Sequence, residues 1–549
     1  MKRFLGRSTT FIIVLALIMV AAVALRVLAF KNITFFYDQA RDIFESQRII
    51  TSGDFIKIQG PMTDIPGVFH GPLYWYIIAP FVYLMGGLPY AAKAFLIILN
   101  VLCIPVLYWV TMRMTKQRNV ALVAACLFAV SFEAIQYGRW MSNPAPALLP
   151  ILVSLYGLWC MTQKNIKGVL YFLLSWPLSV QFQFFMVYHG LFFIILFLWN
   201  FRLHDVRTHW KLLLMSLGGS ILLFSPFIVG LFKYRFIAIT NLLQHVAEKE
   251  GGGLTIQSFG QKVWGYIVYS ADPFAYNILS IQVDFRLGLF LLFLAVSVWW
   301  AVRSVGDKSA VVFSLFWIAA PLVIYFFGSL NAYFLTMGNL YGYLLIAAIM
   351  IVRLSESPHR VIRATGMLIF LLVIGSNLMQ VWQTYAKGET LFAIQKGNIL
   401  TDVERVVDHI YAEANDQPFA INTVTNPLFM NTTWAYAFTV FGEKKHGYLP
   451  AWKGLDQTGV FGAEVPFLKL SPQTGATYFV IYEPTGGIPQ EYSIAYELYE
   501  NTRSRMVKKT NIGTFVVEQR IFTNEIGLNI DDIVAMAKSK FVTDRMHKR

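Results

Sequence analysis

Apolar stretches of about 18 to 23 residues recur along the first 383 residues of this 549-residue chain, and each is long enough to cross a bilayer as a helix. Only 14% of the residues are charged, whereas an average soluble domain carries roughly 25%. The sequence therefore predicts a polytopic α-helical membrane protein of about 11 to 13 spans. An even count of twelve would conflict with the charge pattern described next, and the sequence does not decide between the two odd counts.

Basic residues gather in the short loops between the apolar stretches and account for much of the formal net charge of +14. This distribution predicts loops that face the cytoplasm and contact anionic lipid, and it argues against a nucleic-acid partner. The first stretch, Phe11 to Phe30, is longer than a signal-peptide core of about 7 to 15 residues, and no small-residue cleavage site follows it. We therefore expect an uncleaved first span, a cytoplasmic N-terminus and an extracytoplasmic C-terminal region.

The composition divides the chain into two expected domains. Residues 1–383 form the transmembrane domain, with a large first outer loop at 31–71 and a second at 233–285, and residues 384–549 form a soluble α/β domain. In that domain, Val403, Val406, Val407 and Ile410 fall on one face of a helix over 402–414. The segments PFAINTV, ATYFVIYEP and GTFVVEQ have the composition of short strands bounded by turn residues.

The first outer loop is rich in ionisable residues, among them Asp38, Arg41, Asp42 and Glu45. Its run DQARDIFESQRIITSGDF has apolar residues at helical spacing, which predicts an amphipathic helix lying in the membrane interface. Asp38, at the start of that run, could act as a general base or help to bind a cation. The alternative is that Asp38 caps the helix, because Asp is a favoured N-cap residue.

Further polar residues fall in segments expected on the same side of the membrane. His70 precedes Gly-Pro in FHGPLYWY, Arg139 and Asn143 belong to GRWMSNP, and Lys233 and Arg235 begin the second outer loop. Each residue alone fits an interfacial anchor. Together they could line a cavity that is open to the outer face.

The order and spacing of these motifs resemble a known family. LRVLAF at the end of the first span, then YDQARD, then FHGPLYWY, resembles the C-type membrane glycosyltransferases of family 39, which include protein O-mannosyltransferases and the lipid A aminoarabinose transferase. GRWMSNPAPALLP is similar to the short outer turn and following span of bacterial members. The resemblance is strongest over residues 1 to about 200, and the C-terminal domain resembles the outer α/β domain of several members.

The resemblance implies a membrane glycosyltransferase that moves one sugar from a polyprenyl-phosphate donor to an acceptor hydroxyl on the outer face, usually with inversion. By position, Asp38 is the implied catalytic base. The expected donor-phosphate ligands are Arg139, His70, Arg41, Lys233 and Arg235, and the expected acceptor or supporting residues are Tyr37, Asp42, Glu45 and Asn143. A hexosyl or pentosyl group and a glycan, lipid or protein acceptor all remain open, and a bacterial plasma membrane is favoured.

Two departures from the family pattern affect these expectations. Many members have Asp-Glu where this chain has Asp38-Gln39, and many have Pro-Pro where it has Gly71-Pro72. The missing carboxylate leaves the need for a divalent metal ion open, with Asp38 and Asp42 as the ligands if there is one. No other cofactor is implied.

Two other classes of protein fit part of the sequence. A lipid or glycan transporter needs ionisable residues near the bilayer centre, but Lys93 and Glu133, two of the few charges within apolar stretches, lie toward the ends of theirs. A sensor or scaffold that binds a partner through residues 384–549 would leave the charged first loop unexplained. Substitution of Asp38 distinguishes the transferase from the transporter.

Overall fold

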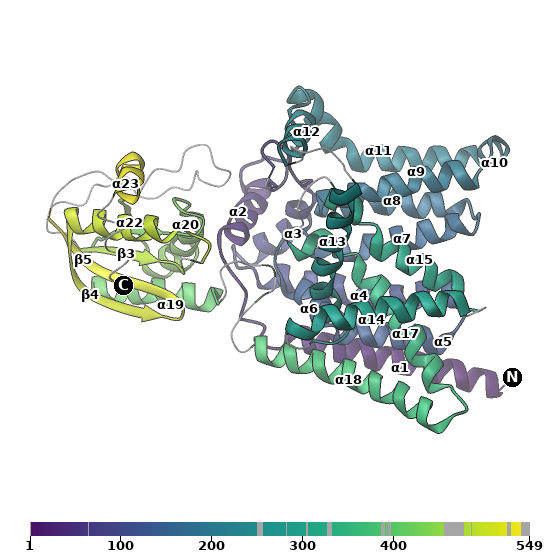
Figure 1. Cartoon of the computed structure of the whole chain (residues 1–549). Helices are drawn as coiled ribbons and strands as arrows, with labels where there is room; N and C mark the ends of the chain where they lie inside the picture. Colours follow the sequence, from purple (N-terminus) through teal and green to yellow (C-terminus); the bar gives the residue numbers. More distant parts are fainter. Residues whose placement is uncertain are drawn as a thin grey trace. The chain divides into compact units, whose positions relative to one another are not determined.

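The structure is a computed structural model, drawn in Figure 1. It describes residues 2–63, 65–249, 256–280, 283–303, 306–326, 332–385, 390, 392, 397–454, 477–484, 486–523 and 529–539. The chain folds into two compact units, and each is described by itself. Unit 1 contains Met1–Leu28, Phe55–Ile77 and Lys93–Gln383, and unit 2 contains Ala29–Asp54, Ile78–Ala92 and Thr384–Arg549.

Unit 1 is built from helices. They are α1 Lys2–Val27, α3 Leu73–Leu84, α4 Tyr90–Thr115, α5 Arg118–Val130, α6 Phe132–Arg139, η1 Ala145–Ala147, α7 Leu148–Thr162, α8 Lys167–Phe182, η2 Phe184–Tyr188, α9 His189–Asn200, α10 Leu203–Thr208, α11 Trp210–Lys233, α12 Ile237–Lys249, α13 Ile256–Asn277, α14 Val283–Arg303, α15 Lys308–Ala319, α16 Leu322–Phe326, η3 Tyr333–Thr336, α17 Asn339–Ser355 and α18 Arg360–Tyr385. Parts of α3, α4 and α18 belong to unit 2. Helices α7, α8, α9 and α11 pack side by side (Figure 1). The segment 233–285, expected as a loop, is mostly helical where the structure describes it, because α12 and α13 fall within it.

Seven helices of the described residues are long and apolar enough to cross a membrane, or eight if α5 and α6 together form one span. The seven are Thr10–Val27, Tyr90–Thr115, Ala145–Thr162, Trp210–Lys233, Phe285–Arg303, Lys308–Phe326 and Arg360–Tyr385. The predicted class, a polytopic helical membrane protein, is confirmed. The expected 11 to 13 spans are approached only when shorter apolar helices such as Leu73–Leu84 and Asn339–Ser355 are included, because several apolar stretches fold into helices of fewer than 18 residues.

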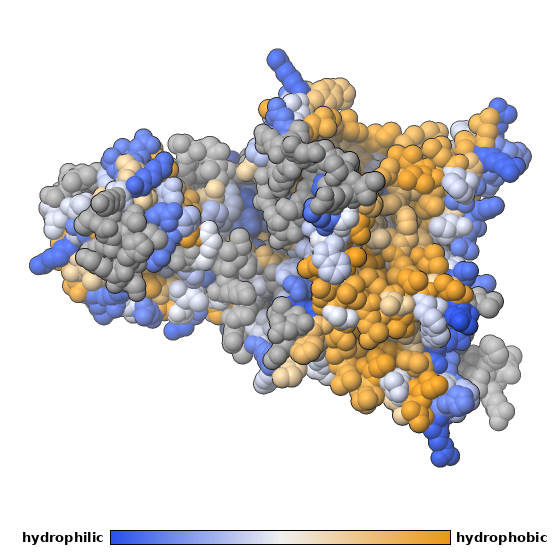
Figure 2. Space-filling model, in the orientation of Figure 1, coloured by the Kyte–Doolittle hydropathy of each residue, from blue (hydrophilic) through white to orange (hydrophobic). Residues whose placement is uncertain are grey.

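The outside of unit 1 is apolar where these helices lie, as Figure 2 shows. Leu214 and Leu222 on α11 and Leu371 on α18 are more than half exposed. Exposed side chains of this kind are stable against lipid tails, and the helices satisfy their own backbone hydrogen bonds. A patch of this extent therefore marks the membrane-embedded part of unit 1.

Polar side chains inside unit 1 hold bends and crossings together. Helices α5 and α6 meet at an angle of 56°. At the break, the backbone N–H of Phe132 donates to Asn377 Oδ1 at 2.8 Å and that of Ala134 donates to Ser131 Oγ at 3.2 Å. Side chains thus accept from the donors that the bend releases, as a broken helix in hydrocarbon requires. The fully buried Arg26 donates to Asn100 Oδ1 at 2.6 Å and to the carbonyl of Ala129 at 3.0 Å, which links α1, α4 and α5.

A closed loop precedes α3 and carries His70. The N–H of Gly60 donates to the carbonyl of His70 at 3.0 Å, and the N–H of His70 donates to the carbonyl of Pro61 at 2.8 Å. A Cβ added to Gly60 would lie 2.2 Å from the carbonyl oxygen of Gly71, so only glycine allows this close approach of backbone to backbone. Gly71 in turn donates to the carbonyl of Gln181 at 2.9 Å.

Unit 2 contains a five-stranded sheet in the order β2-β1-β3-β5-β4. The strands are β1 Ala420–Val424, β2 Ala451–Trp452, β3 Thr477–Tyr482, β4 Ser504–Ile512 and β5 Phe515–Phe522, and the helices are α2 Tyr37–Thr51, α19 Leu400–Ala414, α20 Thr432–Ala437, η4 Phe438–Glu443, α21 Lys444–His446, α22 Gln490–Arg503 and α23 Ile530–Ala537. Strand β1 is parallel to β2 and β3, whereas β5 is antiparallel to β3 and β4. The helix predicted over 402–414 and the three predicted strands are confirmed. Strand β4 was missed because SRMVKKTNI is mostly exposed and lacks an apolar alternation.

Helices cover both faces of the sheet. On one face, Tyr478 and Val480 of β3 pack with Ile494 and Tyr499 of α22. On the other face, Phe479 lies 5.5 Å from Phe419, measured between ring centroids, and Tyr411 on the apolar side of α19 packs against the same Phe419 ring. Alternate side chains of β3 thus pack into the cores on the two faces of the sheet. Because both faces are covered, the segment is a continuous apolar run in the sequence.

A buried carboxylate at the end of β3 makes the stability of unit 2 depend on pH. Glu483 Oε2 accepts from the backbone N–H of Asn426 at 2.9 Å, and Oε1 accepts from Trp434 Nε1 at 2.9 Å. Burial raises the pKa of Glu483 from its ordinary value of 4.5 to about 7, although both hydrogen bonds oppose the rise. The folded state therefore keeps this proton in a pH range in which the unfolded chain has already lost it.

The first prediction concerns this proton. Because the pKa of Glu483 is raised in the folded state, the free energy of unfolding falls as the pH rises from 4.5 to about 7. The total loss is about 3 kcal/mol, and it does not grow above that range. We expect the apparent melting temperature of the purified Glu483→Gln chain to improve relative to the native chain between pH 5 and pH 8. A difference between the two chains that does not change with pH would contradict this.

The second prediction concerns the loop around His70. Gly60→Ala should destabilise the chain by about 1 to 3 kcal/mol, because the new methyl group overlaps the backbone of Gly71. Gly218→Ala is the matched control, since a Cβ there meets nothing within 4 Å. Thermal unfolding of both variants in the same detergent checks the prediction, and equal melting temperatures would refute it.

Candidate active site

The helix α2 carries five of the predicted site residues, and its start differs from the expectation. The backbone N–H of Phe36, the residue before the helix, donates to Gln39 Oε1 at 3.3 Å. Asp38 therefore lies within the first turn and is not the N-cap residue, so the capping role considered from the sequence is wrong. A carboxylate in a first turn is stabilised by the positive end of the helix dipole.

Arg41 organises the charges of α2. Its Nη1 donates to Asp38 Oδ1 at 2.6 Å, and its Nε and Nη2 donate to Asp42 Oδ1 at 3.0 and 2.8 Å. The guanidinium also lies over the ring of Tyr37, with its carbon 5.3 Å from the ring centroid. One buried cation thus holds two carboxylates and an aromatic ring in a single arrangement.

The acids of α2 differ sharply in exposure. The side chain of Asp38 is 39% exposed, whereas those of Asp42 and Glu45 are each 1% exposed. Glu45 accepts from Arg48 at 3.1 Å. Burial raises the pKa of the Tyr37 phenol, so this neighbour of Asp38 stays neutral. Asp38 is therefore the acid of this group that can reach a substrate.

The apolar side of α2 contacts protein. Phe44 lies 5.9 Å from Tyr436 of α20, and Phe35, just before α2, lies 4.8 Å from the same ring. Ile43 is fully buried. The prediction of an amphipathic helix is confirmed, and its apolar face packs against α20. Its position in the lipid interface stays a prediction.

The chain leading into α2 is tied to the C-terminal residues by backbone hydrogen bonds. The N–H of Phe35 donates to the carbonyl of Asn398 at 3.0 Å, and the N–H of Leu400 donates to the carbonyl of Ile33 at 2.9 Å. The hydroxyl of Tyr436 donates to the carbonyl of Gly87 at 2.9 Å, so the turn between α3 and α4 joins the same assembly. The helix that carries Asp38 is consequently positioned by segments far away in the sequence.

In unit 1, His70 and Asn143 meet at the break between α8 and η2. The N–H of Phe184 donates to His70 Nδ1 at 3.1 Å, and Asn143 Nδ2 donates to the carbonyl of Phe182 at 2.8 Å. Because Nδ1 accepts a hydrogen bond, a neutral imidazole must carry its proton on Nε2. His70 is buried, so its ring is held in one orientation.

The remaining predicted cations lie elsewhere in unit 1. Arg139, at the end of α6, interacts electrostatically with the fully buried Lys93 of α4. Lys233 and Arg235 are exposed at the turn between α11 and α12, where Arg235 has a φ of 51°. The structure thus brings His70 and Asn143 to one segment and Arg139 near Lys93, whereas Lys233 and Arg235 stand on a separate turn.

A second charged group in unit 1 was not singled out from the sequence. Arg286 Nη1 donates to Asp272 Oδ1 at 2.9 Å and to the Tyr276 hydroxyl at 3.3 Å, and the Tyr333 hydroxyl donates to Asp272 Oδ2 at 3.3 Å. The Asp272 side chain is 38% exposed. Asp272 is an acidic residue within the segment 233–285, which the sequence predicts on the same side of the membrane as Asp38. This position is the sequence signal that points to the group.

The residues named as metal ligands do not fit a divalent ion. The guanidinium of Arg41 lies between Asp38 and Asp42, where a shared cation would have to lie. Within the described ranges, no group of three or more His, Cys, Asp or Glu side chains could hold a metal ion. We therefore derive no step through a metal.

Comparisons with known proteins agree with the resemblance stated from the sequence. The family model described as dolichyl-phosphate-mannose-protein mannosyltransferase matches residues 52–243. Comparison with curated protein sequences finds no match. The resemblance to this family is thus found again over residues 52–243.

Two solved structures share the fold of this chain over nearly its whole length. ArnT from Cupriavidus metallidurans bound to undecaprenyl phosphate has a TM-score of 0.52 and 12% identity, and the match covers 94% of this chain and 98% of that one. ArnT from Cupriavidus metallidurans in the apo state has a TM-score of 0.52 and 11% identity, with 93% and 98% covered. At this identity the likeness concerns the fold.

The third prediction compares the contributions of Arg41 and Asp38 to the free energy of unfolding. Arg41→Met should cost about 3 to 5 kcal/mol, because it leaves the Asp42 carboxylate buried without its cation. Asp38→Asn should cost at most about 1 kcal/mol, since its partly exposed ion pair contributes little. Thermal unfolding of the two variants tests this, and a large loss in Asp38→Asn would show that Asp38 is mainly structural.

Proposed function

We propose that this protein is a membrane glycosyltransferase that moves one sugar from a polyprenyl-phosphate donor to an acceptor hydroxyl on the extracytoplasmic face. The fold, the family match over residues 52–243 and the membrane-embedded helices support this class. The observation that carries it is the partly exposed Asp38 carboxylate, held by Arg41 at 2.6 Å on a helix that packs against α20.

Asp38 is the proposed general base. Its carboxylate takes the proton of the acceptor hydroxyl while the acceptor oxygen bonds to the anomeric carbon of the sugar. The bond from that carbon to the phosphate oxygen breaks, and the polyprenyl phosphate leaves with the electron pair. Attack from the face opposite the phosphate inverts the configuration at the sugar carbon.

Arg41 is the proposed positioning residue for that base. Three of its N–H groups are engaged by Asp38 and Asp42, so the geometry favours an orienting role over the donor-phosphate role expected from the sequence. A base held in one orientation loses less freedom on reaching the transition state. Tyr37 supports the same arrangement through its ring, and Glu45, with its partner Arg48, is a supporting residue of the helix.

The leaving phosphate needs donors of hydrogen bonds or positive charge. His70 is the best-defined candidate, because its ring orientation is set by Phe184 and its neutral form carries the proton on Nε2. Arg139, with Lys93 nearby, is the second. The exposed Lys233 and Arg235 are weaker candidates, and Asn143 shapes the loop through its bond to Phe182.

The fourth prediction tests the base. Asp38→Asn should lower the transfer rate by about 10²- to 10⁴-fold, the usual contribution of a general base. The assay uses the purified full chain, a panel of polyprenyl-phosphate sugars and membrane extract as the source of acceptor. The product's anomeric configuration, read by NMR, tests inversion in the same samples.

Asp408→Asn is the matched control for this experiment. Asp408 is 40% exposed and pairs with Lys445 at 2.7 Å, so it resembles Asp38 in exposure and partner but lies on α19. Full activity in Asp408→Asn and loss in Asp38→Asn would support the proposal. If the folded native chain consumes no donor with any acceptor source, the transferase is wrong and transport of a lipid or glycan should be measured next.

A further inference from the structure

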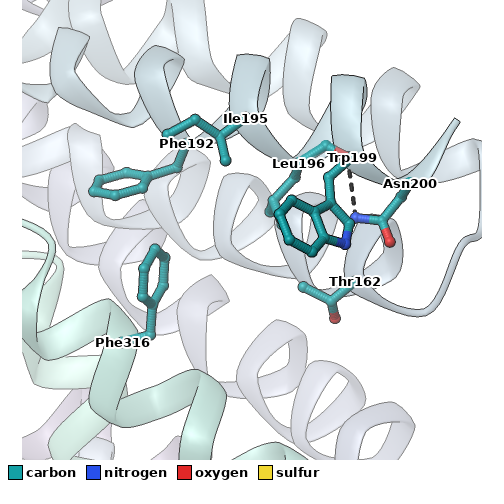
Figure 3. A pocket seen from close by; sticks show the side chains of 7 residues that line it. All are labelled: Thr162, Phe192, Ile195, Leu196, Trp199, Asn200 and Phe316. Carbon is teal, nitrogen blue, oxygen red and sulfur yellow. Dashed lines mark hydrogen bonds between the residues drawn. The ribbon is translucent and has the colours of Figure 1, made fainter.

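A groove of about 370 Å³ opens on the surface of unit 1 between α7, α9 and α15 (Figure 3). Its lining consists of Thr162, Phe192, Ile195, Leu196, Trp199, Asn200 and Phe316. At one end, the rings of Phe192 and Phe316 lie 4.9 Å apart at 82°. At the other end lie Thr162 and Asn200, so the lining changes from apolar to polar along its length.

The polar end coincides with the ends of two helices and with positive charge. Helix α7 ends at Thr162 and α9 ends at Asn200. Lys164 follows the end of α7 by two residues, and Arg202 follows the end of α9 by two residues. Lys167 begins α8, and all three side chains are exposed. The apolar groove thus runs toward a group of three cations, here called the basic rim.

Tryptophans locate this end of the groove at the membrane boundary. Trp199 lines the groove and is 85% exposed, and Trp210, which begins α11 beyond α10, is 55% exposed. Exposed Trp residues are typical of the level of lipid headgroups. An acyl chain can therefore occupy the apolar part while the headgroup lies beside the basic rim.

We propose that this groove binds an anionic phospholipid of the bilayer. Phe192, Leu196 and Phe316 contact one acyl chain, and Lys164, Lys167 and Arg202 attract the phosphate. The positive-inside pattern assigns this basic end to the cytoplasmic leaflet, whereas the proposed transfer takes place on the extracytoplasmic face. The groove is thus a lipid site in addition to the one that the sugar donor would use.

The test measures retained lipid by native mass spectrometry of the purified full chain. Phosphatidylglycerol and phosphatidylcholine with the same acyl chains are offered separately. Each cation near an anionic membrane surface contributes an attraction equivalent to roughly fivefold in binding. We expect one retained phosphatidylglycerol and at least about fivefold weaker retention of phosphatidylcholine.

Two variants locate the site. Leu196→Trp fills the groove and should abolish retention, whereas Leu222→Trp, on the lipid-exposed side of α11, should leave it unchanged. The triple variant Lys164→Gln, Lys167→Gln and Arg202→Gln should remove the preference for phosphatidylglycerol. Arg360→Gln with Arg363→Gln, which neutralises exposed cations at the start of α18, should not.

Three results would overturn the proposal. Equal retention of the two phospholipids, or retention that survives Leu196→Trp, would mean annular lipid only. Undecaprenyl phosphate that displaces phosphatidylglycerol and is lost in Leu196→Trp would assign the groove to a polyprenyl lipid. If Leu196→Trp lowers the melting temperature in phosphatidylcholine, the triple charge variant decides whether the preference for phosphatidylglycerol depends on the basic rim. Lipid retention is measured without reference to transfer activity, so it tests this proposal independently of the proposed function.

Discussion

The structure depends on one constraint, which is that backbone polar groups in hydrocarbon must find partners within the protein. Unit 1 meets it with long helices whose apolar side chains remain exposed, as on α11 and α18. Where a helix must bend, as between α5 and α6, side chains of Ser131 and Asn377 accept from the released donors. Regular spans and their interruptions thus follow from the same requirement.

Helix α2 carries several charged side chains, and contacts with other parts of unit 2 hold it in place. Tyr436 contacts the aromatic residues on both sides of the start of α2, and backbone hydrogen bonds join residues 33 and 35 to residues 398 and 400. Within α2, Arg41 is the partner of both carboxylates. It neutralises the buried Asp42 and orients the partly exposed Asp38. The C-terminal domain therefore has a structural role in positioning the candidate base.

Solvent exposure distinguishes the basic rim of the groove from the His70 side chain in unit 1. The basic rim of the groove lies where α7 and α9 end, beside exposed tryptophans. The His70 side chain is instead buried, and its loop is closed by backbone contacts around Gly60 and Gly71. Exposed cations suit a lipid headgroup that exchanges with the bilayer, whereas an oriented imidazole suits a phosphate that must be placed for reaction.

The sequence by itself determined the membrane class, the strands β1, β3 and β5, the helix α19 and the helix α2. These elements have strong periodicity or long apolar runs, which depend on solvent or lipid alone. It also singled out Asp38, Arg41 and His70 as residues out of place in so apolar a chain. It missed β4, whose side chains are exposed and therefore carry no apolar pattern.

Only the tertiary structure decided which charges of α2 are buried and which remain partly exposed. The sequence offered Asp38 as a possible cap, but the N-cap is Phe36, whose backbone N–H donates to Gln39 Oε1. Arg41, which the sequence predicts as a phosphate ligand, donates hydrogen bonds to Asp38 and Asp42. These ion pairs join residues one and three positions apart on the same helix, so their spacing is local, but their free energy depends on burial, which the packing around α2 decides.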